Sequence, residues 1–267
     1  MVHLAAKHLA VKKNQDRTAC VENKIIICDG IGQFPESGKA AEITIENIKF
    51  SELGKTAEII GYINAAAKEI KEANIVGGTT LITAFIDHTT EIAMAKLVYI
   101  GNGSVFHLHG DFNELPASYN ETNKPYRFSN ILIPHIDKEG ILLRHISHDS
   151  GAPELIPSLI ELSLTGLYGD IILLFSDGIS SLEDDVIVQD EHQRIWRNQS
   201  ENVTSIIDNL HLWLIENCNE VSKSKLDSFL ETELVQLKEA KKLEDDASIG
   251  LIITEDVLTY YKETYVA

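Results

Sequence analysis

Two strongly apolar runs in this chain each end at or one residue before an Asp-Gly dipeptide, and this feature constrains the fold more than any other. Residues 25–28 are all apolar and are followed by Asp29, and residues 171–175 are all apolar and lead to Asp177. Short continuous apolar runs bounded by turn residues are typical of strands buried on both faces. We therefore expect two central strands that each carry a carboxylate to the end of a sheet.

The remaining periodic segments fall into runs of strands and pairs of helices. Because these classes are segregated rather than alternating one for one, we expect an α+β fold of mostly antiparallel sheets flanked by helices. No repeat, low-complexity tract or linker marks a boundary, so residues 1–267 are expected to form one domain. The predicted helices are one that begins at residue 38 with Ser37 as N-cap, 55–73, 202–217 and 223–240. The predicted strands are 18–28, 131–133 with 141–145, 169–178 and 247–254, together with 80–86, 93–100 and 104–109, which short polar turns separate and which are expected to form a meander.

Net charge limits the classes of binding partner, and the cysteine content indicates the cellular compartment. The 41 acidic and 23 basic side chains give a formal net charge of −18, which argues against nucleic acid and anionic membrane as partners. The three cysteines form no CxxC pattern and suit a reducing compartment, so a cytoplasmic location is expected. No window is apolar and long enough for a membrane span. The sequence leaves the oligomeric state open.

Carboxylates at predicted strand ends form the candidate site. An Asp-Gly pair taken alone predicts only a turn. Carboxylates from separate segments that meet in space, however, repel one another unless a cation lies between them, and oxygen ligands select Mg²⁺ or Mn²⁺. A backbone carbonyl beside such a ligand is accessible where no Cβ crowds it, which explains Gly30. The candidate carboxylates are Asp16, Asp29, Asp177, Asp245 and Asp246.

A series of short segments spans nearly the whole chain. They are Asn14-Gln15-Asp16, Asp29-Gly30-Ile31-Gly32, the helix from Ser37, Gly78-Thr79-Thr80, Gly101-Asn102, Leu164 to Asp170, Ser176-Asp177-Gly178 and Asp245 to Ser248. Together and in this order they resemble the motifs of the metal-dependent protein phosphatases of type 2C, the PPM family, in their compact bacterial form.

The resemblance implies a fold, a reaction and a set of site residues. The fold is a four-layer sandwich of two packed, mostly antiparallel sheets flanked by helix pairs. Asp29 would bridge two Mn²⁺ or Mg²⁺ ions, Gly30 would offer its carbonyl to one, Asp177 and Asp245 would hold the other, and Asp16 would lie in or beside that shell. The implied reaction is hydrolysis of phosphoserine or phosphothreonine in a protein substrate by water, without a covalent intermediate, with Asp29, Asp177 and Asp245 as catalytic residues.

The chain departs from the family pattern where the phosphate is clamped. The family's phosphate-binding Arg falls at Val11, and an apolar side chain cannot hold a phosphate as a bidentate guanidinium does. Lys12 or Lys13 could supply a looser positive charge and are the candidate substrate-binding residues. Arg17 points elsewhere if the side chains alternate along a strand.

Three further departures concern residues around the ligands. Gln15 replaces the motif Glu, Asn102 stands where the family usually has Asp, and Asp246 replaces the closing Asn. We expect these three side chains to surround the metal ligands rather than to bind metal themselves. The departures leave open a regulatory binding module without turnover, and a phosphatase of small metabolites, beside the active protein phosphatase.

His107 and His109 would place two imidazoles on one face of a strand. A zinc site needs a third ligand, and the sequence shows none in register. We therefore expect an exposed histidine pair rather than a metal site.

Overall fold

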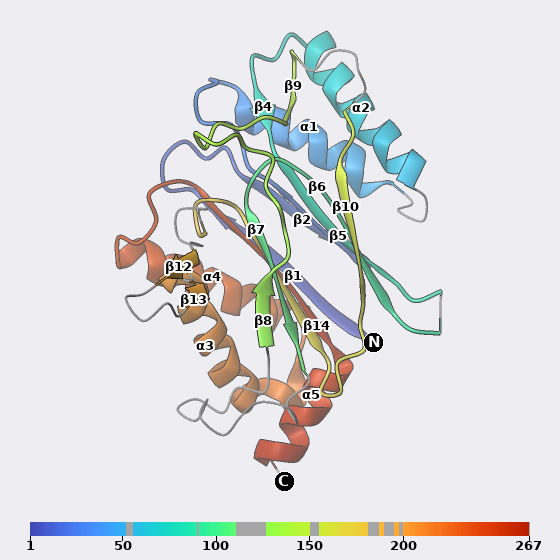
Figure 1. Ribbon diagram of the computed structural model, residues 1–267, viewed down its shortest axis with the longest axis vertical. Coiled ribbons are helices and arrows are strands. Elements are labelled where there is room, and N and C mark those ends of the chain that lie inside the picture. Colours follow the sequence, from blue (N-terminus) through green and yellow to red (C-terminus); the bar gives the residue numbers. More distant parts are fainter. Residues whose placement is uncertain are drawn as a thin grey trace.

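The computed structural model describes residues 1–51, 56–89, 91–110, 127–149, 155–180, 187–189, 195–197 and 200–266. Figure 1 shows two β-sheets packed face to face, with helices α1 and α2 on one outer side and α3 and α4 on the other. This arrangement is the predicted α+β sandwich of four layers.

Among the residues that the structure describes, each sheet has five strands, and every strand pair in them is antiparallel. Sheet A has the order β1 (Val2–Leu9), β14 (Ala247–Thr254), β11 (Asp170–Phe175), β7 (Ser104–His109) and β8 (Arg127–Asn130). Sheet B has the order β10 (Ser158–Ser163), β6 (Met94–Ile100), β5 (Leu81–Asp87), β3 (Lys24–Cys28) and β2 (Arg17–Val21). Two short ribbons pair β4 (Gly78–Thr79) with β9 (Ile146–Ser147) and β12 (Ile187–Gln189) with β13 (Ile195–Arg197).

The helices bury apolar stripes against the outer sheet faces. In α3, the buried residues Val203, Ile206, Ile207, Leu210 and Leu214 recur with the helical period. The Ser222 side chain accepts a hydrogen bond from the Lys225 amide and so caps the next helix. The helices are α1 (Ser37–Lys49), α2 (Thr56–Glu72), α3 (Glu201–Asn217), α4 (Lys223–Glu239) and α5 (Glu255–Tyr261), with short turns η2 (Cys218–Glu220) and η3 (Lys262–Val266).

Three apolar layers hold the sandwich together. One joins sheet A to α3, α4 and α5, one joins sheet B to α1 and α2, and the third lies between the sheets. The middle layer contains Ile27 and Ile82 from sheet B and Ile172 and Leu174 from sheet A. Since these strands contribute apolar side chains to both of their faces, they read as continuous apolar runs in the sequence.

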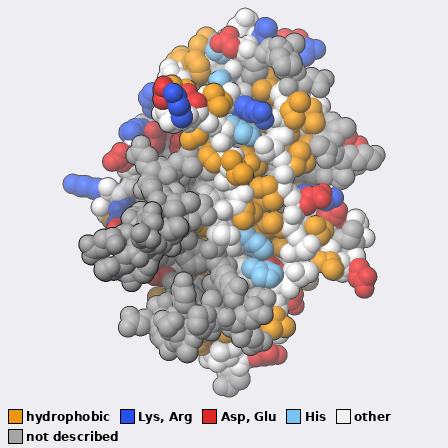
Figure 2. Space-filling view, viewed as in Figure 1, with side chains coloured by type: hydrophobic (Ala, Val, Ile, Leu, Met, Phe, Trp, Pro, Cys, Tyr) orange, Lys and Arg blue, Asp and Glu red, His pale blue; other side chains and the backbone are white. Residues whose placement is uncertain are grey.

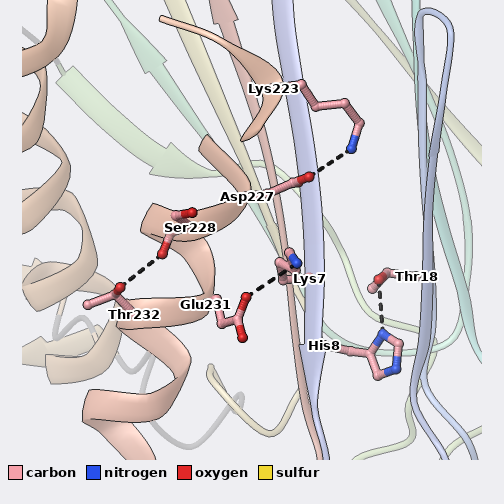
Figure 3. A network of polar contacts seen from close by, with 8 residues as sticks. All are labelled: Lys7, His8, Thr18, Lys223, Asp227, Ser228, Glu231 and Thr232. Atoms are coloured by element: carbon pink, nitrogen blue, oxygen red, sulfur yellow. Dashed lines mark hydrogen bonds and ion pairs between the residues drawn. The ribbon is translucent and has the colours of Figure 1, made fainter. Parts of the chain in front are cut away.

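Strand β1 contacts a helix with one face and sheet B with the other (Figure 3). The Lys7 ammonium lies 3.4 Å from Glu231 of α4, whereas the ring of His8 lies on the opposite side, with Nδ1 3.0 Å from the Thr18 hydroxyl of β2. Successive side chains of a strand alternate between faces, so these neighbours tie β1 to two different layers.

Four sequence predictions about elements need correction. The single strand expected over 18–28 is a hairpin, β2 and β3, with Glu22 at φ 51° in its turn. The predicted cap Ser37 is the first residue of α1, and its hydroxyl donates to the Ile31 carbonyl instead. The hairpin expected over 131–133 and 141–145 is reduced to one isolated bridge between Ile136 and Leu142.

The fourth correction concerns β7, which does not continue a meander with β6. It pairs with β8 and β11 in sheet A, while β6 stays in sheet B. Gly101 at φ 112° and Gly103 at φ 103° form the connection, and such backbone angles are available mainly to glycine. The chain therefore changes sheets at the Gly-Asn-Gly turn. Among the described residues, no helix is both long and apolar enough to cross a membrane.

Candidate metal centre

The strand register brings the predicted carboxylates to one end of the sandwich. In sheet B, Arg17 pairs with Cys28, so Asp16 and Asp29 lie next to each other beyond the strands. In sheet A, Phe175 pairs with Ile249, so Asp177 and the start of β14 lie at one end of that sheet. Asp29 and Asp177 lie within hydrogen-bonding reach of each other, so these ends of sheet A and sheet B meet.

Asp29 is the centre of this group. Removal from water is the largest influence on its carboxyl, followed by the negative charges of Asp177 and Asp16, and together they raise the pKa of Asp29 well above its usual value. Its backbone is held by two threonines: the Thr79 hydroxyl and the Thr80 amide both donate to the Asp29 carbonyl, at 2.9 and 2.8 Å. The carboxylate is thus fixed at a position where negative charge is costly.

Asp16 is buried beside Asp29, with only 2% of its surface exposed. Its Oδ2 accepts a hydrogen bond from the Ser248 hydroxyl at 2.8 Å. Its Oδ1 is also buried and has no hydrogen-bond partner among the residues that the structure describes. Burial raises the pKa of Asp16 to about 6. A buried carboxylate oxygen without a donor is costly unless something outside the protein satisfies it.

Asp177 approaches the group from sheet A. Its Oδ2 accepts a hydrogen bond from the Asn102 amide at 2.6 Å, so the neutral side chain at this departure from the family pattern contacts a predicted ligand directly. A Cβ on Gly178 would lie 2.1 Å from the Asp246 carbonyl oxygen. Gly178, which follows Asp177, is therefore required because the segment leading into β14 approaches closely.

Asp245 lies at the rim of the group and not within it. Its side chain is 56% exposed and lies 3.8 Å from the Lys12 ammonium. One carboxylate oxygen accepts the backbone amide of Asp246 at 2.9 Å. The structure thus places three predicted ligands together, Asp16, Asp29 and Asp177, and leaves Asp245 at the surface beside a lysine.

Asp246 organises the backbone of the entry segment. Its Oδ1 accepts the amides of Val11 and Lys12, and its Oδ2 accepts the amide of Gln15, at 2.7 to 2.9 Å. Burial by itself would raise the pKa of Asp246, but the backbone amides of Gln15, Lys12 and Val11 outweigh it and hold the pKa below the usual value. Both carboxylate oxygens of Asp246 are thus occupied by backbone amides of the entry segment.

Gln15 and Gly30 lie where the entry segment packs against the Asp29-Gly30 turn. The Gln15 side chain donates to the Phe34 carbonyl at 2.9 Å. A Cβ at Gly30 would lie 2.6 Å from Cβ of Gln15 and 2.8 Å from its carbonyl oxygen. The glycine is needed because the entry segment crosses directly over the Asp-Gly turn.

The arginine and lysine side chains around the site differ in whether protein groups already occupy their N–H donors. Arg17 donates to Glu42 at 2.8 Å and to the Asn14 and Asp16 carbonyls, so its guanidinium is occupied by protein groups. The Lys13 ammonium donates to the Gly32 carbonyl. Lys12 is more than half exposed and remains beside Asp245.

The residues present fit a divalent cation. The donors are oxygen atoms of Asp16, Asp29 and Asp177, which are the atoms that Mg²⁺ and Mn²⁺ prefer. Without positive charge the carboxylates repel: beside burial, the negative charges of Asp177 and Asp16 raise the pKa of Asp29. The orphaned Oδ1 of Asp16 points to the same requirement.

Neither a protein-family model nor a curated protein sequence matches the chain. Solved structures do. The catalytic domain of the Ser/Thr protein phosphatase PstP, in complex with two manganese ions, superposes with a TM-score of 0.61 at 16% identity, covering 94% of this chain and 97% of that one. The chain has the fold of the PPM phosphatases. PstP/Ppp of Mycobacterium tuberculosis gives 0.59 at 16% identity, covering 95% and 99%, and the PPM phosphatase MsPP of Mycobacterium smegmatis, in complex with cacodylate, gives 0.57 at 14%, covering 94% and 97%.

The PPM fold explains why sequence reasoning found the carboxylates but missed their supports. Ser248 lies within the closing motif, yet nothing in that motif indicates that its hydroxyl reaches Asp16. Thr79 and Thr80 were part of a recognised motif without a role, and the structure gives them one at the backbone of Asp29. In each case the partner lies on a different strand of the PPM sandwich, so only the packed sheets reveal the contact.

Proposed function

We propose that the protein is a metal-dependent protein phosphatase that hydrolyses phosphoserine or phosphothreonine. Two Mn²⁺ or Mg²⁺ ions would be held by Asp16, Asp29, the Gly30 carbonyl and Asp177, and Asp245 would join them by turning from Lys12 toward the ions. One observation carries the proposal: Asp29 lies within hydrogen-bonding reach of both Asp16 and Asp177 at the meeting ends of two sheets. When bound, a metal pair of this kind makes water acidic enough to act as a nucleophile and stabilises charge on phosphate oxygens.

The chain's own residues fix where the ligands lie. The Ser248 hydroxyl holds one oxygen of Asp16 and leaves the other available. The Asn102 amide holds one oxygen of Asp177. Because both partners are neutral donors, they orient the carboxylates without cancelling the negative charge that a cation requires.

Lys12, beside the exposed Asp245, is placed to bind the phosphate of the substrate. Its exposed ammonium lies beside Asp245 and is free to turn toward a phosphate, whereas Arg17 is committed to Glu42. A lysine acts as a flexible point charge and lacks the bidentate geometry of a guanidinium. We therefore propose weaker and less directional phosphate binding than an arginine would give, with Lys13, whose ammonium donates to the Gly32 carbonyl, contributing further positive charge.

The proposal extends to partners and location. A phosphorylated protein is the proposed substrate, in bacterial signalling in the cytoplasm. The three cysteines are free thiols, which suits a reducing compartment. Nothing in the described residues favours a binding module without turnover.

Hydrolysis of p-nitrophenyl phosphate and of a phosphothreonine peptide, with Mn²⁺ supplied to the full chain, tests the proposal. Asp29→Asn and Asp177→Asn should lower the rate by more than about 100-fold, because loss of a ligand exceeds the effect of losing an outer partner. The matched control is Asp256→Asn, an exposed carboxylate at the other end of β14. Wild-type rates equal to those of Asp29→Asn would contradict the proposal, and calorimetric binding of the phosphopeptide without turnover would establish the binding module instead.

A further inference from the structure

A second group of potential metal ligands lies at the opposite end of sheet A. Strands β7 and β11 pair so that Asp170 is directly opposite His109, and His107 lies two residues farther along β7. Side chains at positions i and i+2 of a strand share a face, and directly opposed residues share it as well. The third ligand that sequence spacing did not show is therefore supplied by the neighbouring strand.

The three side chains converge on one point. Oδ1 of Asp170 lies 2.8 Å from Nε2 of His107 and 2.7 Å from Nδ1 of His109. The two rings are 5.4 Å apart and tilted by 60°, so each directs one nitrogen at the carboxylate. One donor atom from each of the three residues lies within 4.8 Å of the others.

The carboxylate is held as a ligand would be. Asp170 is 1% exposed, its Oδ2 accepts the Gly166 amide at 2.9 Å, and its own amide donates to the Thr254 hydroxyl at 2.8 Å. Burial alone would raise the pKa of Asp170, but hydrogen bonds from His107, Gly166 and His109 lower it below its usual value. Metal-binding carboxylates are commonly fixed by a hydrogen bond to their second oxygen.

The histidines leave a path to solvent. The His107 side chain is 15% exposed and that of His109 is 34% exposed. Figure 2 shows histidine side chains among the groups that reach the surface of the face drawn. An ion can therefore enter from solvent and keep one position open to water, while the buried carboxylate lies behind it.

We propose that His107, His109 and Asp170 form a Zn²⁺ site that is separate from the carboxylate centre. Two imidazoles and one carboxylate match zinc, whereas all-oxygen groups select Mg²⁺ and Mn²⁺. A single ion replaces the two protons that both rings would otherwise need in order to donate to the same oxygen. Asp170 and Asp177 are separated by the length of β11, roughly 20 Å at the strand rise per residue. The site links β7 to β11 and stabilises this end of sheet A.

Zinc titration of the full chain tests the proposal. Chelator-treated protein is titrated with ZnCl₂ by calorimetry in excess Mg²⁺, which competes for the carboxylate centre. Wild type should bind one zinc equivalent, and His107→Gln and His109→Gln should weaken that binding by at least about 100-fold. His3→Gln is the matched control, because His3 forms a single histidine–carboxylate pair with Glu255 at 3.0 Å and has no second imidazole.

The doubly substituted Asp29→Asn, Asp177→Asn protein separates the two centres. Its zinc equivalent should be unchanged, and Co²⁺ added to it should give the visible absorption of a four-coordinate ion, absent in His109→Gln. The proposal is overturned if wild type takes up no zinc in Mg²⁺, if His109→Gln binds zinc as tightly as wild type, or if the zinc equivalent disappears with Asp29 and Asp177. Melting curves in EDTA identify any unfolded variant, and the more exposed His109 decides the outcome if His107→Gln does not fold.

Discussion

The Asn102 amide donates a hydrogen bond to Oδ2 of Asp177 across 2.6 Å, from a turn in which two glycines have positive φ. The Gly-Asn-Gly connection carries the chain from β6 in sheet B to β7 in sheet A. The residue that orients a proposed ligand is therefore placed by the crossing between sheets. Its neutral side chain adds no charge to the three carboxylates nearby.

Replacing Asn102 by Asp should destabilise the metal-free protein. Two carboxylates would then face each other, and like charges at this distance disfavour ionisation of both. We expect the free energy of unfolding in EDTA to fall by roughly 1–3 kcal/mol relative to wild type, the usual range for a buried polar group that loses its partner. Saturating Mn²⁺ should recover most of the loss. Asn102→Ala removes the hydrogen bond without adding charge, so equal stability of the two variants in EDTA would refute charge repulsion.

The stability of the metal-free protein should depend on pH through Asp16. Its folded pKa of about 6 lies above the ordinary 3.8 because of burial. Below about pH 4 the group is protonated in both states and costs nothing, whereas above about pH 6 its charge costs roughly 2–3 kcal/mol, at about 1.4 kcal/mol per pKa unit. In EDTA, Asp16→Asn should therefore gain stability over wild type as the pH rises from 4 to 7. Urea unfolding at several pH values measures this difference, and a difference that is constant or shrinks with pH would contradict it.

Asp246 should matter mainly for folding of the entry segment. Asp246→Ala removes the acceptor of three backbone amides and should cost roughly 2–4 kcal/mol of unfolding free energy. Asp246→Asn keeps one oxygen for Val11 and Lys12 but places an amide near the Gln15 amide, so we expect a smaller loss. Chemical denaturation in EDTA, where metal binding cannot contribute, measures both variants. If both variants lose the same free energy of unfolding, the negative charge of Asp246, and not the position of its acceptor oxygens, stabilises the entry segment.

Lys12 should affect substrate binding more than turnover. Lys12→Ala removes an exposed positive charge beside Asp245, and we expect KM for a phosphopeptide to rise by roughly 2–5-fold with little change in kcat, since exposed charge contacts contribute about 1 kcal/mol or less. Raised salt should reduce the difference. Lys242→Ala is a matched control, because Lys242 is also exposed and lies 3.9 Å from Glu201. A fall in kcat with unchanged KM would assign Lys12 to the chemical step.

Val11→Arg should strengthen phosphate binding. The backbone of Val11 is already fixed by Asp246, and its side chain is only partly buried, so a longer side chain can be accommodated. A guanidinium at this position would supply the bidentate contact that the lysines lack, and KM for the phosphopeptide should fall by about 10-fold, the range of one charged hydrogen bond. Steady-state kinetics with Val11→Met, which adds length without charge, distinguishes charge from packing. Unchanged KM in Val11→Arg would show that the entry segment does not face the phosphate.

The sequence predicted the central elements because their side-chain patterns are strong. Helices α3 and α4 and strand β14 appear within one residue of their predicted bounds, and the apolar runs 25–28 and 171–175 lie in β3 and β11. β1 was missed because Lys7 and His8 interrupt its apolar residues, and its pairing with β14 joins the two ends of the chain. The β6–β7 meander was wrong because strand patterns do not specify which sheet a strand enters.

The sequence alone determined which atoms this protein can offer to a cation, since Asp29 and Asp177 follow apolar runs that are typical of buried strands. Tertiary structure decided which of them meet. The antiparallel register joins Asp16 to Asp29, sheet packing brings Asp177 to them, and the pairing of β7 with β11 places Asp170 beside His107 and His109. Local preferences extend over a few residues, whereas these contacts connect residues far apart in the chain and arise from burying the apolar faces of two sheets against each other.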